Sequence, residues 1–212
     1  MKKVFLLIPI AALLICSAKK IDTYPFDKWD SSTMEKANTG KDASFLSAEE
    51  KSVVYYMNLA RLNPELFEKT YLLKFLDSAK VKSSSFVGSI KNDLLNKYKP
   101  MEALVVKEDL STEATDHAKD LNETGKRTPF SKDGKSYEFR TAKFKGVYKG
   151  VVENCDYGNK NPLAIVISML VDEGTATIEH RNNIMNKMIK FVGVSVQPHK
   201  KDKWCCVQEF GK

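Results

Sequence analysis

The 212-residue sequence lacks the short motifs that mark several common enzyme and metal-binding classes. No serine stands in a G-x-S-x-G context, so the nucleophile signature of α/β-hydrolases is missing. No C-x-x-C pair occurs either, and this removes the usual cysteine spacing of a structural zinc site. An internal repeat and a low-complexity tract are also absent, which argues against repeat and fibrous architectures.

The basic residues are not organised as nucleic-acid recognition requires. Lys and Arg number 34 against 27 Asp and Glu, giving a formal net charge of +7. The lysines are scattered, and no basic stripe with interleaved aromatic residues appears, so nucleic acid is not an expected partner. The composition, 42% hydrophobic and 29% charged, is that of a globular protein, and the length suits one domain with a sizeable core.

The first 18 residues have the pattern of a secretory signal peptide. Lys2 and Lys3 precede an apolar run at residues 4–15, which is too short to span a bilayer comfortably, and small residues follow. The alternative is a buried N-terminal helix. A lipid anchor at Cys16 is a further alternative and would be the only membrane attachment, although Ile15 fits a lipoprotein signal poorly. The pattern predicts an exported protein, located in the periplasm, on the outer surface or outside the cell.

Three cysteines would remain after removal of this segment: Cys155, Cys205 and Cys206. In an oxidising compartment, one disulfide from Cys155 to either of the other two is expected, with one free thiol left over. Because neighbouring residues in a strand point to opposite faces, only one of the adjacent pair can meet Cys155.

Capping signals divide most of the chain into helices. Residues 19–46 are polar and aperiodic and predict a linker or extended lead-in. A capping box at Ser47 opens a helix and the domain, which we place at residues 47–212. The dipeptide Asn63-Pro64 starts a second helix, and a long helix is predicted from about residue 107 to 124. Residues 126–147 are predicted to be a long basic loop.

The C-terminal half mixes strands with helices. Residues 148–154 predict a strand, residues 163–171 an apolar helix closed by Gly174, and residues 179–186 a short helix. Alternating valines at 191–197 and a run at 203–210 predict a terminal hairpin. The expected fold class is α+β, with a small antiparallel sheet flanked by helices.

Three local patterns carry the chemistry-bearing residues. An A-x-x-H-A-x-D stretch spans residues 114–120, an E-N pair stands at Glu153, and His180 opens an H-R-N-N-I-M stretch. A V-G-V strand at 192–194 and a W-C-C-V-Q-E-F-G strand at 204–211 follow. In this order the patterns resemble the CAP superfamily of cysteine-rich secretory, antigen 5 and pathogenesis-related proteins, in its bacterial SCP-like branch.

The resemblance implies an α-β-α sandwich with a central cleft that holds two histidines and two acidic residues. By position, Glu153 matches one of the two acidic residues and His180 matches one of the two histidines. Asp172 or Glu173 lies near the place of the second acid. The loop that usually supplies the other histidine, residues 128–134, contains none. The resemblance therefore implies at most a weak divalent metal site, for example for zinc, built on His180 and Glu153.

Each candidate also has a purely structural interpretation. His117 lies on the apolar stripe of its helix, so it is either a cleft residue or, as the pattern favours, a core histidine bonded to backbone. Glu153 could bond loop amides instead of lining a cleft, and His180 could have a capping role. His199, in a lysine-rich turn, is expected to be exposed.

Two functions from different classes follow. The first is an exported, non-enzymatic protein that binds a small apolar ligand, an envelope component or a protein through the cleft. The second is a metal-assisted, peptidase-like hydrolase that uses His180 and Glu153. The missing loop histidine favours the first, or a structural envelope protein with a vestigial cleft.

Overall fold

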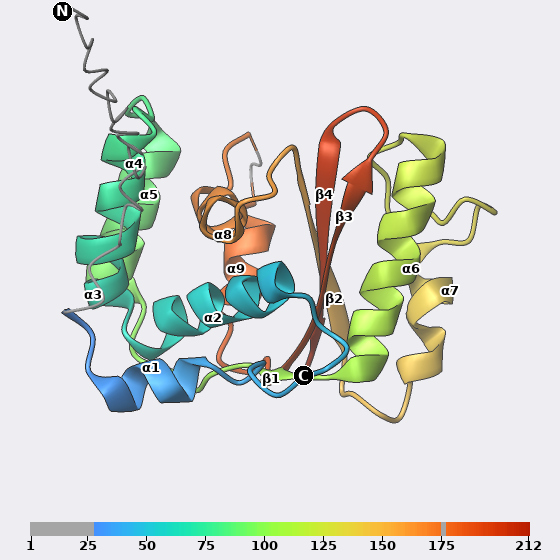
Figure 1. Cartoon of the computed structure of the whole chain (residues 1–212), viewed down its shortest axis with the longest axis horizontal. Helices are drawn as coiled ribbons and strands as arrows, with labels where there is room; N and C mark the ends of the chain where they lie inside the picture. Colours follow the sequence, from blue (N-terminus) through green and yellow to red (C-terminus); the bar gives the residue numbers. More distant parts are fainter. Residues whose placement is uncertain (1–27, 175–176) are drawn as a thin grey trace, which may run out of the picture.

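A computed structural model describes residues 28–174 and 177–212, and it has three layers (Figure 1). A sheet lies between α6 and α7 on one side and a larger group of helices that includes α2 and α8 on the other. This confirms the predicted α+β sandwich. The predicted signal peptide and Cys16 lie outside the described residues. Within the described ranges, no helix is long and apolar enough to span a bilayer.

The sheet has four strands in the order β1-β3-β4-β2. They are β1 (Val105–Val106), β2 (Val151–Tyr157), β3 (Phe191–His199) and β4 (Lys203–Gly211). The last three are antiparallel, as predicted, and β3 and β4 form the terminal hairpin. The two-residue β1 pairs with β3 in parallel, so the sheet is mixed.

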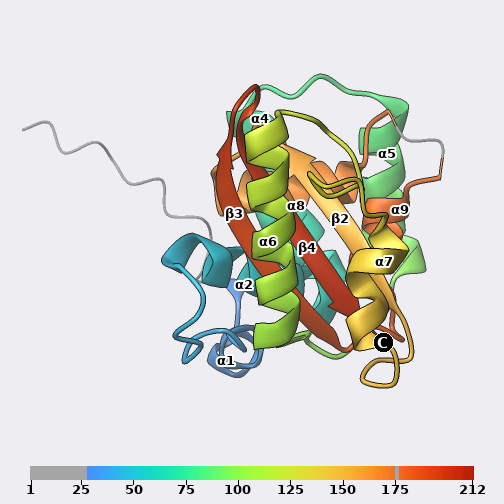
Figure 2. The same cartoon turned by 90° about the vertical axis from the view of Figure 1, so that its right-hand side faces the viewer.

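Side-chain alternation assigns each face of the sheet to one helical layer. Val192, Val194 and Phe210 pack into the main core with residues of α2 (Ala48–Leu62) and α8 (Pro162–Val171). The opposite face is covered by α6 (Glu108–Thr124), which lies across β3 and β4 in Figure 2. A Cβ at Gly193 would lie 2.1 Å from backbone atoms of Leu110 and Ser111, so only glycine allows this close approach.

The remaining helices surround these layers. They are α1 (Ser31–Ala37), α3 (Pro64–Phe67), α4 (Leu73–Ser78), α5 (Ser85–Asn92), α7 (Tyr137–Thr141) and α9 (Glu179–Ile184), with π-helical turns at Glu68–Leu72 and Asp93–Lys97 and a 3-10 turn at Ala142–Phe144. The predicted capping box at Ser47 is present, and Asn63 and Asn161 cap the helices that follow them. Gly125, at φ +62°, ends α6 as predicted.

Several segments differ from the predictions. Residues 28–46 are not an extended lead-in, because α1 forms there and Trp29 is buried in the core. The predicted basic loop at 126–147 contains α7 and the 3-10 turn. β2 begins three residues later than predicted, at Val151. Asp172, in the left-handed conformation, ends α8 before Gly174 is reached.

Candidate functional site

The two residues that define the predicted cleft lie on opposite faces of β2. Glu153 points toward α6 and α7, where it contacts His117 and Arg140. Its neighbour Asn154 points the other way and bonds α9. His180, at the start of α9, contacts Asp172 on this second side. The structure thus replaces one expected cleft with two separate groups of titratable side chains.

The first group is built around Arg140, which lies in α7 and is almost entirely buried. Its guanidinium nitrogens lie 2.7 Å from a Glu113 oxygen, 2.8 Å from a Glu153 oxygen and 3.6 Å from a Glu209 oxygen. Lys143 adds a second cation, 2.5 Å from Glu113. Several carboxylates buried this close together require paired cations, because moving an isolated charge from water into the protein interior is strongly unfavourable.

Glu209 differs from the other two acids because it is fully buried and, among the described residues, has no cation at hydrogen-bonding distance. Burial raises the pKa of Glu209 well above its ordinary value, and the neighbouring Glu153 raises it further. The Tyr137 hydroxyl donates to Glu209 at 3.4 Å. Burial also raises the pKa of Tyr137, so this hydroxyl stays neutral and can donate. The raised pKa favours the protonated form of Glu209, and protonation limits the negative charge of the group.

His117, from α6, is the buried imidazole of this group, with 1% of its surface exposed. Its Nε2 lies 3.7 Å from Glu153 Oε1, beyond hydrogen-bonding distance. Within the described part of the chain neither ring nitrogen has a hydrogen-bond partner, so the predicted bond to backbone is wrong. Burial lowers the pKa of His117, and the ring is neutral near pH 7.

A cavity of about 400 Å³ opens above this group, between α6 and residues 131–143. His117, Phe139 and Arg140 are among the residues that line it. Lys132 lines it from the loop in which the resemblance places a histidine. The acids and bases of the wall are close to balanced in number.

The second group joins the C-terminal end of α8 to α9. His180 Nδ1 lies 2.7 Å from Asp172 Oδ1, and this hydrogen bond raises the pKa of His180. Arg181 holds the turn by donating to two backbone carbonyls of α8 and to Asp93. Asp156, on β2, accepts from the Asn159 amide at 2.9 Å, and burial raises its pKa to about 6.

His180, Asp172, Glu173 and Asp156 line a second cavity, of about 390 Å³. Its apolar lining comes mainly from α4 and α8, with Phe75, Leu76, Ala164, Ile167 and Met169 among the residues, and Arg127, Asn159 and Ser168 add further polar groups. Of the five predicted cleft residues, three therefore meet here (Asp172, Glu173 and His180), while Glu153 and His117 meet on the other face of β2.

The predicted disulfide is absent, since Cys155, Cys205 and Cys206 are all free thiols. Cys155 faces Val207 across the β2–β4 ladder, while Cys205 faces Tyr157. The two cysteines on the α6 side are thus diagonal neighbours, farther apart than a disulfide allows. Cys206 points to the opposite face. His199 is buried and not exposed as predicted, because its Nδ1 accepts from the Asp202 amide.

Sequence reasoning missed Glu113, Arg140, Asp156 and Glu209. One signal was available: Glu209 follows Cys205 and Val207 at alternate positions of a predicted strand, so it must share their buried face. Arg140 carried no such signal, because its partners come from α6, β2 and β4.

Comparison with solved structures finds two bacterial chains of low similarity. An extracellular protein containing an SCP domain from Bacillus anthracis str. Ames is 20% identical, with a TM-score of 0.43. The match covers 59% of this chain but only 39% of that one. An outer surface protein from Borrelia burgdorferi is 19% identical, with a TM-score of 0.44, over 53% of this chain and 79% of that one. Among curated proteins no significant match is found.

The match to a family model, unlike the matches to solved structures, establishes the family of this chain. A family model described as CAP, the cysteine-rich secretory protein family, matches residues 54–210. This range contains all three patterns noted in the sequence and both groups of titratable residues. The chain belongs to the CAP family.

Proposed function

We propose that this CAP protein is exported and binds a small ligand, without catalysis, in the cavity between α4, α8 and β2. The observation that carries the proposal is the lining of this cavity, which combines apolar side chains of α4 and α8 with a few polar groups that include Asp156, Asp172 and His180. Ligand sites typically combine mostly apolar lining with a few polar groups that fix orientation. Support for export is the basic start and the apolar run at residues 4–15.

The charged groups of the lining indicate which ligands suit the cavity. Asp156, Asp172 and Glu173 supply three carboxyl groups, against His180 and Arg127. Arg127 is engaged by Asp202, with a guanidinium nitrogen 2.5 Å from a carboxylate oxygen. The lining is therefore acidic near pH 7, and it favours a ligand whose polar group is a cation or a hydrogen-bond donor over one with a carboxylate.

A fluorescence displacement experiment tests this proposal. The neutral apolar dye N-phenyl-1-naphthylamine should bind the protein with 1:1 stoichiometry. Decylamine should displace it at far lower concentration than decanoate, which has the same chain length and the opposite charge. Equal displacement by both, or no dye binding, would refute the proposal.

A pair of variants locates the binding. Ala164 lines the cavity, so Ala164→Phe should fill part of it and weaken dye binding at least tenfold. Ala48 is exposed at the start of α2, outside this cavity, and Ala48→Phe serves as the control that should leave binding unchanged.

The alternative function, a metal-assisted hydrolase that uses His180 and Glu153, is disfavoured by the geometry. Metal ligands must converge within a few ångström of one ion. Here the two side chains face different helical layers, and Arg140 already occupies Oε2 of Glu153. Turnover of a peptide or ester substrate that is lost in both Glu153→Gln and His180→Gln would restore this function.

A further inference from the structure

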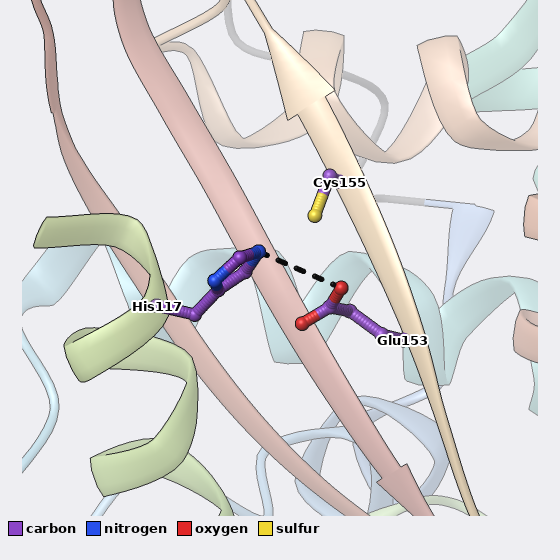
Figure 3. A group of neighbouring side chains, drawn as sticks. All are labelled: His117, Glu153 and Cys155. Atoms are coloured by element: carbon purple, nitrogen blue, oxygen red, sulfur yellow. Dashed lines mark ion pairs between the residues drawn. The ribbon is translucent and has the colours of Figure 1, made fainter. Parts of the chain in front are cut away.

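Three potential metal ligands meet in the interior between α6 and β2. His117 comes from the helix, and Glu153 and Cys155 come from alternate positions of the strand, which places both on the face toward α6 (Figure 3). One ligand atom from each residue lies within 4.8 Å of the other two. Cys155 also lines the cavity of the proposed function, whereas His117 and Glu153 do not. Metal binding by this group does not require a ligand in that cavity.

The state of His117 indicates that something is missing from this group. A buried polar atom without a partner is unfavourable by about 1–3 kcal/mol, and such atoms are rare in folded proteins. Within the described residues, both nitrogens of His117 lack hydrogen-bond partners. Figure 3 shows the imidazole pointing at Glu153, with Cys155 beside them.

The spacing fits coordination better than hydrogen bonding. Ligand atoms about 2.0–2.3 Å from a tetrahedral ion are about 3.3–3.8 Å from each other. His117 Nε2 and Glu153 Oε1 are 3.7 Å apart, which is too far for a hydrogen bond but within this range. The thiol needs to approach by only about 1 Å, which a side-chain rotation can supply.

The kinds of ligand atom select the ion. One imidazole nitrogen, one carboxylate oxygen and one thiolate sulfur suit zinc and similar transition metals, whereas calcium and magnesium take oxygen ligands. Arg140 holds the other oxygen of Glu153, at 2.8 Å, and thereby fixes the carboxylate with Oε1 toward His117. An outer partner of this kind is typical of metal ligands.

We propose that His117, Glu153 and Cys155 form a binding site for one divalent ion of the zinc class. Nitrogen Nε2, oxygen Oε1 and sulfur Sγ supply three ligands, and a water from the cavity above His117 completes the set. On binding, the Cys155 thiol releases its proton to solvent, so that thiolate and carboxylate together neutralise the ion. The site differs from the pair that the resemblance implied, since it uses His117 in place of His180 and adds a thiolate.

Cobalt(II) titration of the mature chain, residues 19–212, tests the site. The protein is reduced and freed of metal by chelation. One equivalent of cobalt should then give a near-ultraviolet sulfur-to-cobalt charge-transfer band and intense visible bands of a tetrahedral ion, and zinc should remove both. The absence of a charge-transfer band would overturn the proposal.

Matched variants assign the ligands. Cys155→Ser should abolish the charge-transfer band, and His117→Gln should weaken cobalt binding at least tenfold. Cys206→Ser changes a buried thiol on the opposite face of the sheet, and His180→Gln changes the other candidate histidine, so neither should affect the spectrum. Loss of the band in either control, with retention in Cys155→Ser, would contradict the assignment.

A measurement on the unmodified chain covers the case in which a variant does not fold. Saturating zinc should slow alkylation of Cys155 at least tenfold, as read by mass spectrometry of the labelled peptides. Cys205 and Cys206 in the same sample report general unfolding. Their alkylation should slow only by the amount that follows from zinc stabilising the whole fold. Equal protection of all three cysteines would show that the ion stabilises the protein without a bond to Cys155, and would reject the site.

Discussion

Arg140 and Glu209 are neighbours in the same buried group, yet their removal should have opposite consequences. Arg140→Met leaves Glu113 and Glu153 buried with less compensation, and losing one partner of a buried pair typically destabilises by about 3–5 kcal/mol. Glu209→Gln replaces a carboxyl that is already protonated with a neutral group of similar shape, so we expect a change below about 1 kcal/mol.

Urea unfolding of both variants at pH 7 measures this difference. Each substitution replaces a buried ionisable side chain with a non-ionisable one of similar size, and the two therefore control for each other. Equal destabilisation would show that Glu209 is ionised in the folded protein.

The His180–Asp172 pair predicts a specific pH dependence. The hydrogen bond to Asp172 raises the pKa of His180 above 6.5, and the carboxyl groups of Glu179 and Asp156, which face the ring from α9 and β2, act in the same direction. A raised pKa means that folding is favoured by protonation. This contribution is fully present below about pH 6.5 and is lost as the pH rises through the pKa of the folded protein.

NMR titration of the His180 ring protons checks the direction of this shift. The midpoint should lie above 6.5 in the wild-type protein and move down in Asp172→Asn. A midpoint at or below 6.5 in the wild type would contradict the contact.

At the scale of elements, the close packing of α6 on the sheet depends on Gly193. Gly193→Ala places a methyl group 2.1 Å from the backbone of Leu110 and Ser111, which cannot rotate away as a side chain could. We expect a loss of at least about 3 kcal/mol in the free energy of unfolding, because the whole helix must shift.

The control is Gly88→Ala in α5, where an added Cβ meets nothing within 4 Å. It should stabilise the protein by about 0.5–1 kcal/mol, since alanine favours the helix. Thermal and urea unfolding of the two variants should therefore shift in opposite directions. A shift of less than about 1 kcal/mol in Gly193→Ala would show that the packing of α6 is looser than described.

The helices and helix ends that could be predicted from the sequence are those determined by residues close by in the chain. The side chains of Ser47, Asn63 and Asn161 cap their helices by accepting from backbone amides three positions further on, and Gly125 ends α6 through its own backbone freedom. Where distant contacts decide, the predictions were wrong. The segment around Arg140 is a helix on the surface whose Arg140 side chain is buried among ion partners from α6, β2 and β4, and no local pattern records them.

The candidate site was predictable only in part, for the same reason. The patterns identified Glu153 and His180 as belonging to the family, but not that they face different layers. That depends on the register in which β2 pairs with β4, which no local pattern in the sequence records. His117 was correctly placed in the interior, whereas its lack of a hydrogen-bond partner among the described residues could be found only in three dimensions.

At the scale of the whole molecule, the predicted signal peptide determines where the protein acts. We expect the mature chain to begin at Lys19, after cleavage behind Ala18, and to be released without a lipid. Mass spectrometry of the protein from the cell exterior or periplasm gives the N-terminus, and deletion of residues 2–18 should retain the protein inside the cell.

Cys16→Ser separates release from lipid anchoring. The substitution should leave both processing and location unchanged if the chain is released. Incorporation of labelled fatty acid into the wild type, lost in Cys16→Ser, would instead establish a lipoprotein. A protein that stays intracellular with its first residues intact would refute export.

The alternation of side chains along β2 has a consequence for how this protein can change over evolutionary time. Odd positions from Val151 to Tyr157 supply one side of the molecule and even positions the other, so a point substitution alters one group of titratable residues at a time. Insertion or deletion of a single residue reverses the parity of every position beyond it. It would exchange the surroundings of Cys155 and Asp156 in one step, so the length of this strand should be under stricter selection than any single side chain in it.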